Sequence, residues 1–149
     1  MSETTTLSAG QVRSLRCVAA MMIPESSTYG VPSAADDAIF ADILRSFGRD
    51  AAQVQAAMQM LDQLAGGTFA DLDAAQRDAV AARFRDAGGE PLKLLTRIIL
   101  QCYYRDDRVM RSLDMEVRPP FPKGFEVEQG DWSLLDPVRK RAKIYREVG

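Results

Sequence analysis

The fold class is decided by the stretch Pro91-Leu92-Lys93-Leu94-Leu95-Thr96-Arg97-Ile98-Ile99-Leu100-Gln101-Cys102. Its apolar residues recur at intervals of three and four, which is the spacing of one face of an α-helix. Pro91 suits the first helical position, because its fixed φ is already helical and its missing N–H is not needed there. This is the most apolar helical segment of the chain, so we expect it at the centre of a helical bundle.

Helical periodicity also occurs before this stretch, in segments that carry start or stop signals. Ser8 has the spacing of a capping box with Gln11, and Pro24 stops the helix that follows. Further helices are predicted to begin at Ser33, Asp50 and Asp73 and to end at Gly48, Gly66 and Gly88, and one more short turn begins at Asp106. The sequence therefore predicts an all-α fold, a small bundle of about five or six helices within residues 1–114.

Residues 115–149 differ in character and are predicted to form an extended arm that is rich in proline and aromatic residues. Three prolines lie between Val117 and Phe125, and they exclude a helix there. Aromatic side chains need a surface to cover, so the arm either wraps back over its own bundle or docks on a partner. A short final helix is predicted over residues 138–147, with five basic residues: Arg139, Lys140, Arg141, Lys143 and Arg146.

Histidine is absent from all 149 residues, and this absence limits the chemistry more than any residue that is present. Without imidazole the chain has no Ser-His or Cys-His nucleophile pair and lacks the commonest zinc, copper and haem ligand. A net charge of -2 argues against a nucleic-acid partner, and no apolar stretch is long enough to span a bilayer. Most enzyme classes are therefore disfavoured, and we predict no catalytic, cofactor-binding or metal-binding residue in this chain.

Two features of the sequence have both a structural and a functional interpretation. Cys17 and Cys102 lie within apolar helical patterns, which favours two buried thiols, with a disulfide between the first and fifth helices as the alternative. Asp36-Asp37 and Asp106-Asp107 are paired carboxylates, but adjacent residues on a helix point in different directions. Helix capping is therefore the preferred interpretation of both pairs.

A partner interface is predicted from the aromatic and basic residues that have no evident place in the bundle. Trp, Tyr and Arg supply much of the binding energy at protein interfaces. The candidate interface residues are Tyr103, Tyr104, Arg118, Phe121, Phe125 and Trp132.

Several short motifs resemble the gluconate 2-dehydrogenase subunit 3 family. Met22-Ile23-Pro24-Glu25-Ser26, followed by Gly30-Val31-Pro32-Ser33-Ala34, is similar to the opening of that family. The segment Phe69-Ala70-Asp71-Leu72-Asp73-Ala74-Ala75-Gln76-Arg77 resembles its phenylalanine-containing turn into the next helix. Tyr103-Tyr104 and the proline-rich exit after it resemble its C-terminal part. The resemblance covers roughly residues 7–136 and rests on the order of the motifs, since each motif alone is short.

The resemblance implies a small helical subunit bound to a large flavoprotein of the glucose–methanol–choline type. In such complexes the large subunit holds FAD and oxidises a sugar, a polyol or another alcohol, and a cytochrome c subunit or another acceptor often takes the electrons. The small subunit supports folding, stability or export of the large one, and no cofactor is expected in this chain. Many family members carry a twin-arginine signal, and the residues before Leu7 have none. We therefore expect a cytoplasmic complex, with periplasmic export through another subunit as the alternative.

Two other functions fit the sequence. A stand-alone helical lyase or isomerase would use Tyr, Asp or Lys chemistry, and it requires a deep pocket with a perturbed acid or base. A regulatory adaptor would dock through the basic last helix, and its binding would depend strongly on salt.

Overall fold

The computed structural model describes residues 7–117 and 129–144. Within these residues the fold is all-α, as predicted, and the only β-type pairing is an isolated bridge between Ser26 and Val31. The chain divides into two compact units, Met1–Val117 and Arg118–Gly149.

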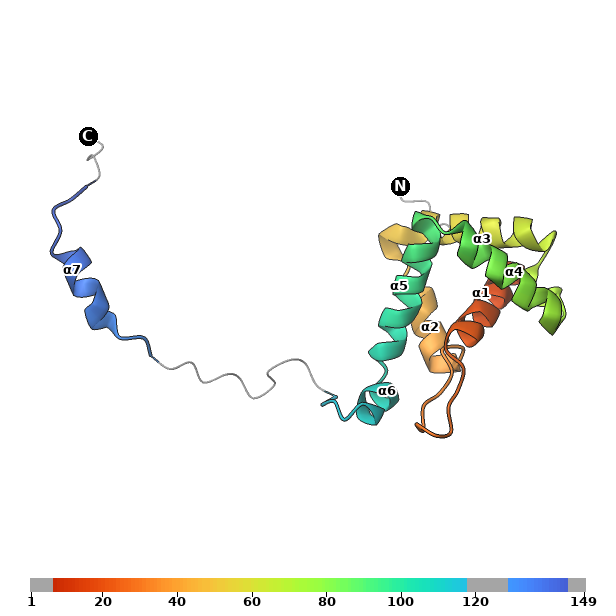
Figure 1. Cartoon of the computed structure of the whole chain (residues 1–149), viewed down its shortest axis with the longest axis horizontal. Helices are drawn as coiled ribbons and strands as arrows, with labels where there is room; N and C mark the ends of the chain where they lie inside the picture. Colours follow the sequence, from red (N-terminus) through yellow and green to blue (C-terminus); the bar gives the residue numbers. More distant parts are fainter. Residues whose placement is uncertain (1–6, 118–128, 145–149) are drawn as a thin grey trace. The chain divides into compact units, whose positions relative to one another are not determined.

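The described part of the first unit is a bundle of α-helices joined by turns and, between α1 and α2, by a longer loop (Figure 1). Its helices are α1 (Ala9–Met22), α2 (Asp37–Arg45), α3 (Ala51–Ala65), α4 (Ala74–Ala87), α5 (Glu90–Tyr104) and α6 (Asp107–Ser112). Two 3-10 turns, η1 (Gly48–Asp50) and η2 (Phe69–Asp71), precede α3 and α4.

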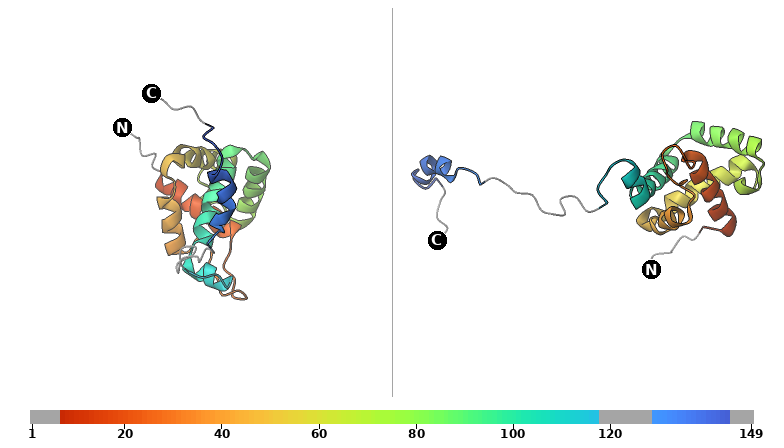
Figure 2. Two further views of the ribbon diagram at one scale, coloured as in Figure 1. Left: turned by 90° about the vertical axis from the view of Figure 1, so that its left-hand side faces the viewer. Right: turned by 90° about the horizontal axis from the view of Figure 1, so that it is seen from below.

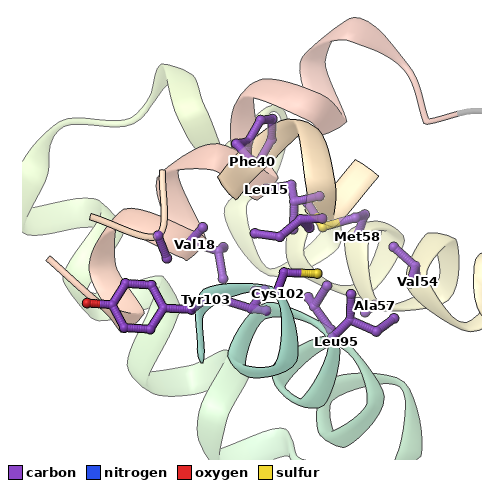
Figure 3. Close-up of a cluster of buried hydrophobic side chains, with 14 of the residues drawn as sticks. Leu15, Val18, Phe40, Val54, Ala57, Met58, Leu95, Cys102 and Tyr103 are labelled. Atoms are coloured by element: carbon purple, nitrogen blue, oxygen red, sulfur yellow. The ribbon is translucent and has the colours of Figure 1, made fainter. Parts of the chain in front are cut away.

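Helix α5 is the central element that the sequence predicts. It packs against α3 and α2 and is followed directly by α6. The buried residues of α5 are Leu95, Ile98, Ile99, Cys102 and Tyr103. They join one continuous core, and Figure 3 shows side chains from α1, α2, α3 and α5 meeting there. Burial of these apolar side chains is the main stabilising contribution to such a bundle.

Most helix ends lie where local chemistry predicts them. Ser8 and Gln11 form the expected capping box at the start of α1, and Asp73 forms another with Gln76 at the start of α4. Gly66 ends α3 in the left-handed conformation, at φ 71°, which glycine adopts without a steric penalty.

The prediction for α2 is wrong at both ends. Ser33 does not cap the helix, because its hydroxyl accepts from the Ala35 N–H and donates to the Ile23 carbonyl. Asp36 is the cap instead, and its carboxylate accepts from the Ala38 N–H. The helix ends at Arg45 rather than near Gly48, because the Ser46 hydroxyl donates to the Asp42 carbonyl at 2.7 Å and competes with the helical pattern.

The turn η2 lies tightly against α1. Phe69 is fully buried in the core, and the Ala70 N–H donates to the buried Ser14 hydroxyl at 3.2 Å. A Cβ on Gly10 would come within 3.3 Å of Thr68, so glycine permits the close approach of the two segments. The phenylalanine-containing turn is therefore a core element.

The second unit contains one short helical run within residues 129–144, formed by η3 (Trp132–Leu135) and α7 (Asp136–Arg139) and drawn in blue in Figure 2. The predicted helix over residues 138–147 is wrong for the part that is described, because the helix ends at Arg139. Consecutive cations follow, and no side chain among the described residues 140–144 is buried to hold a further turn in place. Without packing, so short a helix gains too little to propagate. Arg146 lies outside the described residues.

Candidate partner-docking surface

An apolar groove lies on the bundle between the loop after α1 and the helices α5 and α6. Figure 1 shows this loop, in dark orange, beside α6. The groove has a volume of about 320 Å³. Its lining residues are mostly apolar and come from these three places: Ile23, Pro24, Ser26, Tyr29, Val31, Tyr103, Tyr104, Val109, Ser112 and Leu113. We call this feature the apolar groove.

The loop that forms one wall of the apolar groove is fixed by its own backbone. Ser26 and Val31 exchange two backbone hydrogen bonds, at 3.0 and 3.1 Å, which close a tight turn. Gly30 occupies this turn at φ 62°. The Ala34 N–H donates to the Ile23 carbonyl at 2.9 Å and joins the two ends of the loop. Tyr29 therefore lies at the tip of a loop that backbone hydrogen bonds hold in place, and its side chain is exposed to solvent.

Large apolar side chains gather at the rim of the apolar groove. Tyr29 is 75% exposed, Tyr104 is 53% exposed and Leu113 is 52% exposed. Single exposed apolar residues are ordinary on a protein surface, but several around one concave apolar site are typical of a binding surface. The apolar groove is therefore the candidate docking site of the bundle.

The predicted interface residues lie in different parts of the protein. Tyr104 lies at the rim and is accessible, whereas Tyr103 is only 4% exposed and belongs to the core. The two rings meet edge to face at 5.2 Å, and Figure 3 shows the Tyr103 hydroxyl pointing away from the labelled core side chains. Burial raises the pKa of Tyr103, so its hydroxyl stays protonated at neutral pH. Trp132 is 63% exposed in the second unit, and Arg118, Phe121 and Phe125 lie outside the described residues.

A charged cleft of about 380 Å³ lies between α2, the end of α5 and the start of α6. Arg105 Nε donates to Asp42 Oδ2 at 2.6 Å, and Arg105 Nη2 donates to the Ser46 hydroxyl. The hydrogen bond from Arg105 lowers the pKa of Asp42, and the same bond raises the pKa of Arg105. Both groups are therefore charged at neutral pH and neutralise each other.

Arg108 joins the caps of two helices and holds α6 in place. It donates to both carboxylate oxygens of Asp36, the cap of α2, at 3.2 and 2.7 Å. It also donates to both oxygens of Asp106, the cap of α6, at 3.0 Å each. Because α6 carries Val109 and ends at its cap residue Leu113, both of which line the apolar groove, this ion-pair network fixes one wall of the groove. We call Arg108, Asp36 and Asp106 the Arg108 clamp.

The capping interpretation of the two carboxylate pairs is confirmed for Asp36 and Asp106, which both accept from a backbone N–H at a helix start. The sequence pattern does not indicate that the two caps share one arginine. Asp36 and Arg108 are 72 residues apart, and no local spacing rule reports a contact at that separation. Only the packing of α6 beside the start of α2 creates it.

Both cysteines are free thiols, so the disulfide alternative is excluded. Cys102 is buried, as predicted, and burial raises the pKa of its thiol. Cys17 is only partly buried, with Arg77 Nη1 at 4.0 Å from its sulfur. Within residues 7–117 and 129–144, no three or more Cys, Asp or Glu side chains are grouped as metal ligands, and no helix has the length and apolar content to cross a bilayer.

Comparisons with protein-family models, with curated proteins and with solved structures find no match for this chain.

Proposed function

We propose that this chain is a non-catalytic small subunit that binds and stabilises the large flavoprotein subunit of an FAD-dependent oxidoreductase. The large subunit would be of the glucose–methanol–choline type and would oxidise a sugar, a glycoside or another alcohol. A cytochrome c or another acceptor would take the electrons. The observation that carries the proposal is the apolar groove with its exposed rim of Tyr29, Tyr104 and Leu113.

The position of the motifs supports this assignment of the partner. The loop motif that includes Ile23 and Pro24 and the pair Tyr103-Tyr104 are far apart in the sequence, and both carry the family resemblance. In the fold both line the apolar groove. Two of the three resembling motifs therefore meet at the groove, where a surface for a shared partner would lie, whereas the third, around Phe69, belongs to the core.

The chemistry of the charged cleft also agrees with a structural role. Asp42 and Arg105 neutralise each other, and the pKa of Asp42 is lowered rather than raised. A general acid that works near neutral pH needs a raised carboxyl pKa. These groups are better suited to hold helices in position than to transfer protons, and the FAD chemistry is assigned to the partner.

Co-expression with candidate large subunits, FAD-dependent dehydrogenases of the glucose–methanol–choline type from the same genome, tests the proposal. We expect the soluble, flavin-loaded yield of the large subunit to rise several-fold in the presence of the chain, since a bound partner stabilises the folded state. The purified chain alone should show no flavin absorbance and no dehydrogenase activity. A large subunit that folds and turns over equally well without this chain would contradict the proposal.

The groove itself is tested with the variant Leu113→Asp. This side chain is 52% exposed, so a carboxylate should leave the bundle folded and yet place a charge at an apolar contact. We expect the amount of co-purified flavoprotein to fall about tenfold or more, as for an interface hot spot. Ala79→Asp is the matched control, because Ala79 is exposed on α4, which does not line the groove.

A further inference from the structure

Residues 131–143 expose large apolar side chains on a short helical run. Trp132 is 63% exposed, Leu134 is 74% exposed and Val138 is 56% exposed. None of the described residues of the second unit is buried. A Trp and several aliphatic side chains on so short a segment form a solvent-exposed apolar surface, and its burial against another protein would be favourable. We call residues 131–143 the docking segment.

Residues 132–139 of the docking segment are helical although nothing else described in their unit packs on them, because local interactions start the helix. The Asp131 carboxylate accepts from the N–H and from the hydroxyl of Ser133, at 3.0 and 2.6 Å. Pro137 occupies the first turn of α7, where its missing N–H costs nothing. A preformed helical turn loses less conformational entropy on binding than an unstructured one.

The apolar positions of the docking segment have helical spacing. Trp132, Leu135 and Val138 are separated by three residues each, and Leu134 and Val138 by four. Anchors at these intervals are typical of a short helix that lies in a groove of a partner protein. Trp is the residue type most enriched among energetic hot spots of such interfaces.

The charges of the docking segment are separated along its length. Asp131 and Asp136 come first, and Arg139, Lys140, Arg141 and Lys143 follow. A surface that complements this order is acidic near the end of the helix and not acidic near its start. Such a polarised surface is a property of a protein groove.

We propose that residues 131–143 dock as a short helix into an apolar groove of a partner protein whose wall is acidic next to Lys140 and Arg141. The inference rests on the proposed function in one respect, because it takes this partner to be the large flavoprotein subunit. The docking segment and the apolar groove of the bundle are then two separate contact sites for one partner.

The order of charges favours a protein over an anionic lipid surface. A helix that lies flat on such a membrane carries its cations along one polar face, above a long apolar face. In the docking segment, lying flat would bring Asp131 and Asp136 to the same negative surface as the cations. The apolar face is also only about two turns long, which gives little area to bury in lipid.

The experiment measures the affinity of the full chain for a purified candidate large subunit, an FAD-dependent dehydrogenase of the glucose–methanol–choline type from the same genome, by calorimetry at several salt concentrations. We expect Trp132→Ala combined with Val138→Ala to raise the Kd about 30-fold or more. We expect Lys140→Gln combined with Arg141→Gln to raise the Kd at low salt and to reduce its dependence on salt. Arg49→Gln with Arg85→Gln is the matched control for the loss of two exposed cations, and it should bind as the wild-type chain does.

Each other outcome overturns the inference in a different way. If both docking-segment variants bind as tightly as wild type while Leu113→Asp still weakens binding, this inference is wrong and the proposed function stands. If the wild-type chain does not bind the flavoprotein at all, both are wrong. The last measurement is the binding of the chain and its variants to vesicles of phosphatidylcholine with about 30% phosphatidylserine. Wild-type binding to these vesicles that both variants lose, with flavoprotein affinity unchanged, would assign the segment to a membrane surface instead.

Discussion

The bundle and the docking segment begin their helices with the same local devices, yet the helices differ greatly in length. Asp73 caps α4 and Asp131 caps η3, each by accepting from a backbone N–H. Helix α4 then continues for 14 residues, and α7, which follows η3, has only 4. The difference is burial, because α4 places Val80 and Phe84 in the core and the second unit has no buried residue among those described. A cap decides where a helix begins, and packing decides how far it continues.

The bundle and the docking segment also differ in the partners of their charged side chains. In the bundle, Arg105 and Arg108 each meet carboxylates from another helix, so their charges are neutralised by the tertiary fold. In the docking segment the cations follow one another, and Arg139 forms a local ion pair with Asp136 at 3.6 Å. The bundle therefore uses its charges to fix its own helices, and the docking segment presents charge to its surroundings.

The largest expected effect is the loss of unfolding free energy when a large side chain is removed from the core of the bundle, compared with a large side chain of the docking segment. Phe40→Ala removes a ring that is 2% exposed and that lies under the Arg16 guanidinium at 4.5 Å. We expect the free energy of unfolding to fall by about 3–5 kcal/mol. Leu134→Ala, at a side chain 74% exposed, should change it by no more than about 0.5 kcal/mol. Urea denaturation followed by circular dichroism measures both, and an equal loss in the two variants would show that the docking segment shares a core.

A smaller effect is expected from the Arg108 clamp. Arg108→Gln removes the guanidinium from two carboxylates that are only 28% and 16% exposed, Asp36 and Asp106. We expect a loss of about 1–2 kcal/mol, since charge-assisted, bidentate contacts to partly buried groups are stronger than surface pairs. Arg111→Gln is the control, because its pair with Asp107 is well exposed and should contribute about 0.5 kcal/mol or less. Thermal unfolding of the two variants compares them directly.

The clamp also predicts how stability depends on pH. The hydrogen bonds from Arg108 lower the pKa of Asp36 and of Asp106 below the ordinary value of 3.8. Their contribution is therefore complete above the unfolded pKa and is lost as the pH falls through the lower, folded pKa. Stability should rise with pH in the acid range and level off above about pH 5. In Arg108→Gln this rise should be smaller, and a wild-type acid limb that the variant leaves unchanged would contradict the clamp.

The part of the fold that could be predicted is the part that short-range rules govern. The position of α5, the capping boxes at Ser8 and Asp73 and the stop at Gly66 follow from spacing and backbone chemistry. The start of α2 could not be found in this way. Ser33 has the right residue type for a cap, but its hydroxyl bonds to Ile23 across the loop, and the sequence pattern around Ser33 contains no sign of that contact.

The candidate site was predicted less well, because it is made by tertiary packing. The sequence predicts both Tyr103 and Tyr104 as interface candidates, but only Tyr104 is exposed at the rim of the apolar groove, and Tyr103 is buried, since neighbours on a helix point in different directions. Tyr29 and Leu113 were not identified. Which apolar residues are exposed depends on which ones the tertiary fold buries, and the sequence alone does not give this. Tyr29 lies at the rim because the backbone hydrogen bonds between Ser26 and Val31 close the loop that carries it.

The smallest expected effect compares the helix cap of α4 in the bundle with the helix cap of η3 in the docking segment, because both caps are aspartates. Asp73 and Asp131 are both exposed aspartates that cap a helical run. We expect Asp73→Ala to lower the free energy of unfolding by about 1 kcal/mol, because the capped helix is part of the core. Asp131→Ala should leave the free energy of unfolding unchanged and should reduce only the local helicity of residues 132–139, as read from Cα chemical shifts. If Asp131→Ala destabilises the whole protein as much as Asp73→Ala does, the docking segment is held by packing in the free chain, and its apolar side chains are not available to a partner.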